Sequence, residues 1–174
     1  MGDLEKRAGS LEVTANARRL EGYAAVFNVE TRVGSFNETI LPGAFKAALA
    51  GDIIALADHD QTRVLGRTKS NTLRLNEDSH GLAFSLDVPE TQAGRDLLAL
   101  AERGDLGGMS FGFTIPKGGD SWSGSKRELR TIGLREISIV SAWPAYPQTT
   151  VAARSHSGAT DAEKFMALMM ECAQ

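Results

Sequence analysis

A glycine-rich stretch at residues 107–114, GGMSFGFT, places Ser110 in a G-x-S-x-G string. In many hydrolases this string marks a serine nucleophile on a sharp turn from a strand into a helix. Here the residues after Ser110 alternate between large apolar and small side chains and run into Pro116, which predicts a strand. A strand cannot form the nucleophile turn of an α/β-hydrolase, so an esterase of that class is disfavoured.

A strand gives Ser110 a different geometry, because alternate side chains of a strand face opposite sides of a sheet. The large apolar side chains of residues 109–115 then fill the core, and Ser110 shares the other face with Gly112 and Thr114. Two interpretations remain open. Ser110 is either a serine on a solvated strand face, which these residues alone favour, or a nucleophile that a peptide can approach between the glycines.

An activated serine needs a base within hydrogen-bond reach, usually a histidine, and a third group that orients the base. The chain has three histidines. His80 lies in a predicted turn and His156 in a polar C-terminal segment, whereas His59 follows the apolar run at 53–57 and stands between two aspartates. His59 is therefore the candidate general base. The alternative is a surface histidine in a loop.

The acid that would orient His59 is Glu136. The two aspartates beside His59 are its neighbours in sequence, and neighbours on a strand point away from each other. In the run LREISIV at 134–140, the two isoleucines alternate with polar residues and are expected to face the core. Glu136 and Ser138 then lie on the opposite face of the strand, as Ser110 does on its own strand. A surface ion pair between Glu136 and an arginine, of little energetic value, is the alternative. From the residues alone, His59, Ser110 and Glu136 form a possible triad.

The composition limits the other classes of function. At 174 residues the chain suits one domain, and with 42% hydrophobic and 24% charged residues its composition is ordinary for a soluble protein. No apolar run reaches the length of a membrane helix, and the N-terminus does not have the pattern of a signal peptide. A net charge of −3 offers no electrostatic footprint for nucleic acid.

A single cysteine, Cys172, forbids an internal disulfide and provides no metal-ligand spacing. We therefore expect neither a metal nor a cofactor. A reduced, cytoplasm-like compartment fits this cysteine usage best.

The elements that must hold the candidate residues are mostly strands, and the class is α+β with a sheet or barrel core. Strands are expected within the segments 18–29, 53–59, 64–68, 73–75, 82–86, 112–115 and 128–143. Short helices are expected at 41–51, 91–103 and 161–173, the second with Thr91 as N-cap and Gly104 as its end. The glycine- and serine-rich segment 117–126 predicts a mobile polar loop.

Several blocks of the chain together resemble the prohead serine proteases of tailed phages, the capsid maturation proteases whose fold is similar to that of the herpesvirus assemblins. The resemblance covers roughly residues 20–153, most of the chain, and its blocks are GYAAVFN (22–28), ILPGAF (40–45), the ADHD around His59, LGRT (65–68), GLAFSLDVP (81–89), RGDLGGMSFGF (103–113) and LREISIVSAWPAYPQT (134–149). Each block is weak alone, but seven in the right order make a specific match.

The resemblance implies a mostly antiparallel, assemblin-like β-barrel surrounded by helices. It also implies a serine endopeptidase that cleaves the scaffolding part of the major capsid protein precursor, and itself, inside the immature procapsid in the host cytoplasm. The polar segment at 154–160 is where we expect self-processing. The alternative from another class is a non-catalytic structural or scaffolding protein of the particle with the same barrel. A homo-oligomer is possible, and no nucleic-acid or membrane partner is expected.

The resemblance also carries residue roles. His59 matches the histidine of the family's H-D motif, and Ser110 matches the serine of its M-S-F-G-F motif. In the assemblins the third member is a second histidine downstream, and Glu136 occupies that place here. The assemblins support the oxyanion with an arginine that segment 141–149 lacks, so backbone N–H groups of Gly107 and Gly108 are the expected donors.

The same resemblance divides the chain into three parts. Residues 1–17 are expected to be an N-terminal extension, 18–153 the protease domain, and 154–174 a C-terminal tail with a short helix.

Overall fold

The computed structural model describes residues 5–9, 11–14, 18–142 and 151–154. Their strands form three sheets, two of five strands and one of four, none of which is closed into a barrel. The class is therefore α+β with few helices, as predicted, but the closed barrel is wrong. The core lies between two facing open sheets instead.

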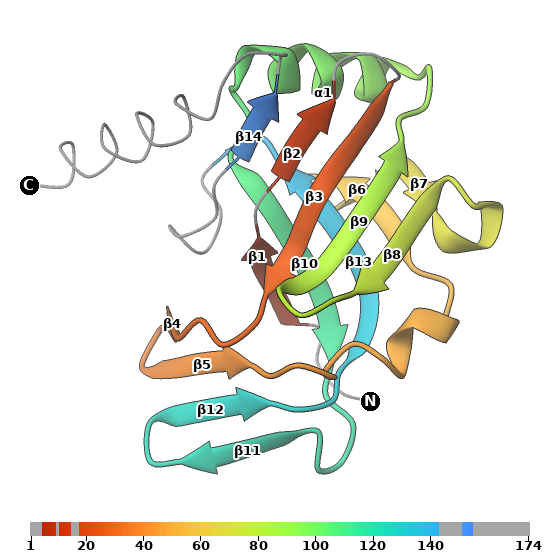
Figure 1. The fold of residues 1–174 in the computed structure, drawn as a ribbon. Coiled ribbons are helices and arrows are strands. Elements are labelled where there is room, and N and C mark those ends of the chain that lie inside the picture. The colour runs from red at the N-terminus through yellow and green to blue at the C-terminus, as the bar shows by residue number, and fades with distance from the viewer. Residues whose placement is uncertain (1–4, 10, 15–17, 143–150, 155–174) are drawn as a thin grey trace, which may run out of the picture.

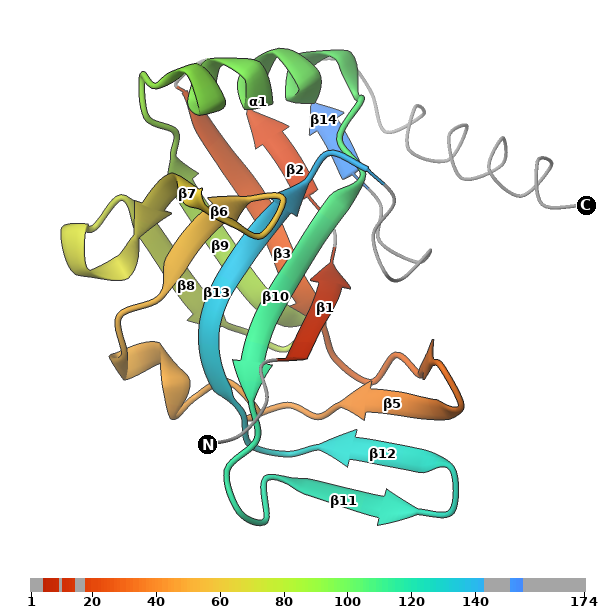
Figure 2. The ribbon, with the colours of Figure 1, turned by 180° about the vertical axis from the view of Figure 1, so that it is seen from behind.

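The first sheet has the strand order β1-β10-β13-β6-β7 (Figure 2). These strands are β1 (Glu5–Gly9), β10 (Gly108–Thr114), β13 (Gly133–Val140), β6 (Ile54–Ala57) and β7 (Asp60–Arg67). β10 pairs antiparallel with β1 and β13, whereas β13 and β6 run parallel. All three candidate catalytic residues belong to this sheet or to the turn between β6 and β7.

The second five-stranded sheet has the order β14-β2-β3-β9-β8 (Figure 1). Its strands are β14 (Val151–Arg154), β2 (Leu11–Thr14), β3 (Arg19–Val26), β9 (Gly81–Asp87) and β8 (Leu73–Glu77). The predicted hairpin at 73–86 is thus confirmed as β8–β9. Two strands from the range expected to be an N-terminal extension, β1 and β2, pair within the large sheets, while the division into three parts remains a prediction.

The core fills the space between these two sheets, where β3 contacts β1 and β10. The predicted inward parity of β10 is confirmed, because its large apolar side chains are fully buried. They meet an aromatic cluster in which Phe45 contacts both Phe27 and Phe111. Strand β10 is therefore fixed on its inner face by packing, which holds its outer face in place.

A small sheet of order β11-β12-β5-β4 lies at one end of the molecule, below the two large sheets in Figure 1. It contains β11 (Asp120–Ser123), β12 (Lys126–Leu129), β5 (Phe36–Ile40) and β4 (Thr31–Val33). The loop predicted at 117–126 is therefore wrong, because the segment forms β11 and begins β12. The Arg127 guanidinium lies over the Trp122 ring and is paired with Glu38 and Asp120.

The helix α1 (Gln92–Arg103) crosses one end of the second large sheet (Figure 1). Its predicted caps are confirmed: the Thr91 hydroxyl accepts a hydrogen bond from Gly94 N at 3.2 Å, and Gly104 ends the helix with φ +77°. Among the described helices, none is long and apolar enough to cross a membrane.

The helix predicted at 41–51 is wrong. The segment forms turns and a single 3₁₀ turn, η1 (Ala48–Ala50). Gly43 has φ +96°, outside the right-handed helical region, and the Glu77 carboxylate accepts hydrogen bonds from Gly43 N and Phe45 N. These bonds satisfy the backbone without a helix. A second 3₁₀ turn, η2 (Thr68–Ser70), follows β7. The helix predicted at 161–173 lies outside the described residues.

Candidate active site

His59 lies in a two-residue turn between β6 and β7, not on the strand that the sequence predicted. Ala57 pairs with Asp60, so Asp58 and His59 are the two central residues of a tight hairpin. Both have positive φ, 52° and 60°, as a type I′ turn requires. This conformation is uncommon for residues other than glycine, although Asp and His adopt it more readily than most, and strained residues cluster at functional sites.

The Asp58 carboxylate imposes this turn. Its Oδ1 accepts a hydrogen bond from Ser141 N at 2.7 Å, and its Oδ2 accepts from the Ser141 hydroxyl at 3.0 Å. Arg63 of β7 also donates to Oδ2, at 2.9 Å. The N–H of Asp58 donates to Ile139 O at 2.9 Å. The turn is thus tied to the end of β13, and the Asp58 carboxylate is engaged by Ser141 and Arg63.

The imidazole of His59 meets the Glu136 carboxylate. Nδ1 and Oε1 are 2.6 Å apart, and the two side chains are 18% and 10% exposed. With its Nδ1–H donated to a carboxylate, a neutral imidazole has Nε2 as its acceptor nitrogen. Neither an exposed loop histidine nor a surface ion pair of Glu136 with arginine describes this contact.

A β-bulge lies directly before Glu136 in β13, whose regular pairing from residue 136 onward puts Glu136 on the face of Ser110. In the pairing of β10 with β13, Gly112 is opposite Glu136 and Phe113 is opposite Leu134, so Arg135 is an extra residue in β13. Without the extra residue, Leu134 and Glu136 would share a face. The bulge lets Leu134 enter the core while Glu136 faces the other way, a use of bulges that is common beside active sites.

Gly112 leaves the space that the Glu136 side chain fills. A Cβ atom at position 112 would lie 2.7 Å from Cγ and 2.9 Å from Oε1 of Glu136. Any larger residue would therefore displace the carboxylate that contacts His59. The second glycine of the G-x-S-x-G string thus shapes the acid's position, a role unlike that in a nucleophile turn.

Ser110 lies on β10, next to the strand that carries Glu136. Its register partners are Ala8 on β1 and Ser138 on β13, and it is 3% exposed. The solvated strand face that the sequence favoured does not describe this serine. Within the part of the chain that the structure describes, no hydrogen bond links its hydroxyl directly to the His59 ring. Such bonds are often long in unliganded sites and tighten when substrate binds.

The two expected oxyanion donors differ in this structure. Gly107 N donates to Val140 O at 2.8 Å, so that N–H already has a partner. A Cβ at Gly107 would also lie 1.7 Å from Ala142 O, so the backbone there is closely packed. Gly108, with φ 142°, has a conformation that side chains rarely adopt. The role of Gly108 as an oxyanion donor stays a prediction.

The sequence pointed to the three residues but not to those that support them. Strand parity suggested Glu136 and Ser110, and the flanking aspartates singled out His59. The role of Asp58 depends on a turn that carries no glycine, and the role of Gly112 depends on a register that the sequence does not show. The roles of His59, Ser110 and Glu136 in a reaction remain predictions, while their arrangement is compatible with a serine–histidine–acid triad.

Comparison with known proteins adds a family. A family model described as Caudovirus prohead serine protease matches residues 3–163. The chain is also 36% identical, over 137 residues, to the prohead protease of Enterobacteria phage HK97. This alignment spans 76% of the chain and 58% of the phage protein, so the chain covers less than two thirds of that relative's length. No solved structure matches the chain.

Proposed function

We propose a serine endopeptidase function for this chain, which belongs to the Caudovirus prohead serine protease family. The observation that carries the proposal is the 2.6 Å contact between His59 Nδ1 and Glu136, beside the strand that bears Ser110. An imidazole held at one nitrogen by a carboxylate offers the other nitrogen as a base. Family membership supports the class of reaction, and the geometry supports the three residues that would perform it.

In the proposed reaction, Ser110 Oγ attacks the carbonyl carbon of a peptide bond as its proton passes to His59 Nε2. Glu136 holds the Nδ1–H tautomer and stabilises the imidazolium that forms. His59 then gives the proton to the departing amine, leaving an acyl ester on Ser110. A water molecule, deprotonated by the same imidazole, hydrolyses the ester and restores the serine.

The substrates in this proposal are the scaffolding part of the major capsid protein precursor and the chain itself. Cleavage takes place inside the immature procapsid in the host cytoplasm, where protease and capsid precursor are confined together. The self-processing segment at 154–160 lies outside the described residues, apart from Arg154. An assemblin-like arrangement of the sheets and a homo-oligomer remain predictions.

Co-expression with the capsid protein precursor tests the proposal. Intact mass spectrometry should find the precursor shortened by the wild-type chain and uncut with Ser110→Ala or His59→Ala. Loss of either group in a triad lowers the rate by about 10⁶-fold. Thermal unfolding should show that both variants are folded. Ser85→Ala, on the second large sheet, is the matched control and should cleave like wild type. Continued cleavage by Ser110→Ala would overturn the assignment.

Covalent labelling separates the protease from the structural or scaffolding alternative. A fluorophosphonate reacts only with an activated hydroxyl, so wild type should gain one adduct, located on Ser110 by peptide mapping, and Ser110→Ala should gain none. A wild-type chain that neither cleaves the co-expressed precursor nor takes the label would favour the structural role.

A further inference from the structure

Ser138 carries a hydroxyl that is buried without a partner. The residue is 0% exposed, and its Oγ is the one buried side-chain polar atom among the described residues that lacks a hydrogen bond. Leaving such a group unpaired destabilises the fold, and most buried polar groups in folded proteins are paired. A partner that is absent in the resting structure would explain this hydroxyl.

The position of Ser138 limits which partner this can be. Ser138 lies on β13 between Ser110 of β10 and Leu56 of β6. It shares its face with Glu136, two residues away on the same strand, because Ile137 between them points into the core. The orphan hydroxyl therefore lies within the candidate site, directly across the strand pair from the proposed nucleophile.

Ser110 is the polar residue directly opposite Ser138 in the strand pair. The Cβ atoms of directly opposed residues lie about 4.5–5.5 Å apart, so rotation about χ1 of either serine can bring the two oxygens within hydrogen-bond distance. The neighbour on the other side, Leu56, has no polar side-chain atom. The Glu136 Oε1 atom is already engaged by His59.

We propose that Ser138 is a positioning residue for the nucleophile, an inference that rests on the proposed protease function. Its hydroxyl donates a hydrogen bond to Ser110 Oγ when Ser110 gives its proton to His59. The proton of Ser138 stays on Ser138, so the step adds no acid or base to the mechanism. Because the acceptor gains negative charge only during attack, the hydrogen bond is made mainly in the transition state, where it accelerates the reaction.

This role predicts that activity and stability respond in opposite ways. Ser138→Ala removes an unpaired polar atom from a buried site, so the melting temperature should stay the same or rise. A hydrogen bond to a charged group is strong enough that its loss should slow phosphonylation of Ser110 by about ten- to hundredfold. A merely structural serine would show the reverse pattern, with a lower melting temperature and an unchanged rate.

The experiment measures the second-order rate of fluorophosphonate labelling across pH 5–9, together with thermal unfolding, for wild type and matched variants. Ser138→Thr keeps the hydroxyl and Ser138→Val replaces it with a methyl group of similar shape, so Thr should retain most of the rate and Val should lose it. Ser85→Ala is the control, because that hydroxyl has partners on a distant sheet. The slowing should be present across the whole pH range.

The outcomes separate this inference from the function on which it depends. If wild type labels and Ser138→Ala and Ser138→Val label at the wild-type rate, the role of Ser138 is wrong and the protease proposal stands. If wild type neither labels nor cleaves the precursor, the proposed function is wrong. Equal losses in the Thr and Val variants would assign the effect to volume and would also overturn the inference.

Discussion

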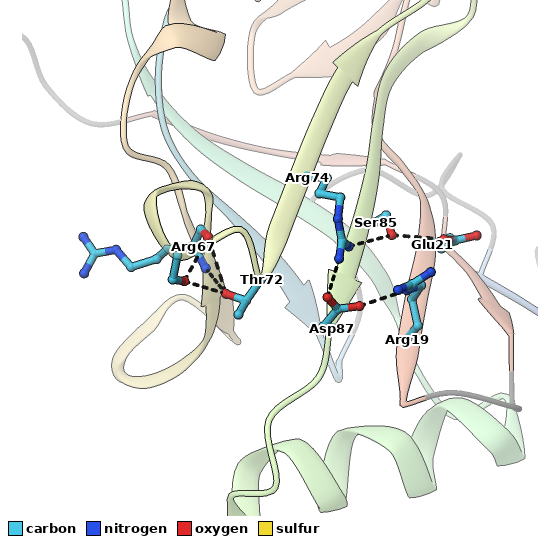
Figure 3. A network of polar contacts seen from close by, with 8 residues as sticks. Arg19, Glu21, Arg67, Thr72, Arg74, Ser85 and Asp87 are labelled. Carbon is cyan, nitrogen blue, oxygen red and sulfur yellow. Dashed lines mark hydrogen bonds and ion pairs between the residues drawn. The ribbon is translucent and has the colours of Figure 1, made fainter.

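Two polar clusters of this molecule, one on each large sheet, use the same side-chain types differently. On the second sheet, Asp87 accepts from both Arg19 and Arg74, and Ser85 lies between Arg74 and Glu21 (Figure 3). The Arg19, Asp87 and Arg74 side chains are 40–48% exposed. On the first sheet, the His59–Glu136 pair is largely buried beside Ser110 and the unpaired Ser138 hydroxyl.

The two clusters differ in how many unfavourable local features each contains, such as positive φ angles, bulges and unpaired buried groups. The residues around Asp87 lie on stretches of strand whose register is unbroken, and their polar groups face partners and water. The other cluster depends on two consecutive positive-φ residues, a bulge at Arg135 and an unpaired buried hydroxyl. Local strain and unsatisfied groups persist at functional sites because the chemistry requires them. The comparison therefore supports the first sheet as the location of the proposed active site.

Glu136→Gln should have the largest effect of the changes that test this comparison. The amide keeps the shape of the side chain but does not stabilise an imidazolium, and it can hold His59 in the wrong tautomer. In a serine–histidine–acid triad the corresponding change lowers kcat by about 10⁴-fold. Phosphonylation rate and precursor cleavage measure the loss. Asp60→Asn is the matched control, since among the described residues the Asp60 carboxylate accepts hydrogen bonds from Thr62, on its own strand, and none from His59.

A different result would contradict the assignment of Glu136 as the orienting acid. If Asp60→Asn lowered the rate strongly and Glu136→Gln did not, the orienting acid would be Asp60, and the buried contact between His59 and Glu136 would be structural. Equal melting temperatures of the two variants would ensure that the rates compare folded proteins.

Gly112→Ala should have the next largest effect. The added methyl would lie 2.7 Å from Glu136 Cγ, so the carboxylate must shift. Misplacing a catalytic group by about 1 Å can cost 10²-fold in rate, so we expect a loss of roughly that size. Gly66→Ala on β7 is the control, because its methyl would meet the Leu86 side chain at 2.7 Å, away from Glu136.

The two glycine variants separate activity from stability. Both should lower the melting temperature, but only Gly112→Ala should also slow labelling of Ser110. If Gly112→Ala labels at the wild-type rate, Glu136 tolerates displacement and does not position His59.

The fold could be predicted from sequence where local signals agreed with the tertiary structure. Strand periodicity identified the β8–β9 hairpin and the inward side of β10, and capping residues identified α1. The prediction failed at 41–51, where Pro42 and the apolar spacing suggested a helix. There Gly43 and a distant carboxylate, Glu77, satisfied the backbone instead.

The candidate site was predictable to the same extent. Parity placed Glu136 and Ser138 on the outer face because the residues from 136 onward alternate regularly. Parity cannot reveal a bulge at Arg135, which exists only in the pairing with β10. The D-H-D sequence likewise gives only a weak sign of a type I′ turn, since aspartate suits the first central position but the second usually holds glycine. What the sequence missed are features that arise between strands.

Asp87→Asn should have the smallest effect and should be confined to stability. Hydrogen bonds from Arg74, and next from Arg19, lower the pKa of the Asp87 carboxyl in the folded protein. A lowered folded-state pKa stabilises the fold above the unfolded-state pKa of about 3.9, and this stability is lost as pH falls through the folded-state value. Water screens these exposed pairs, so the variant should melt only slightly below wild type at pH 7.

The pH dependence tests whether the hydrogen bonds around Asp87 contribute to stability alone and not to activity. The difference in melting temperature between wild type and Asp87→Asn should shrink toward zero as pH falls below 4, and the labelling rate of Ser110 at pH 7 should not change. A loss of labelling in Asp87→Asn would show that the second sheet also affects the reactivity of Ser110. The strained turn and the unpaired hydroxyl would then not be sufficient to identify the functional face.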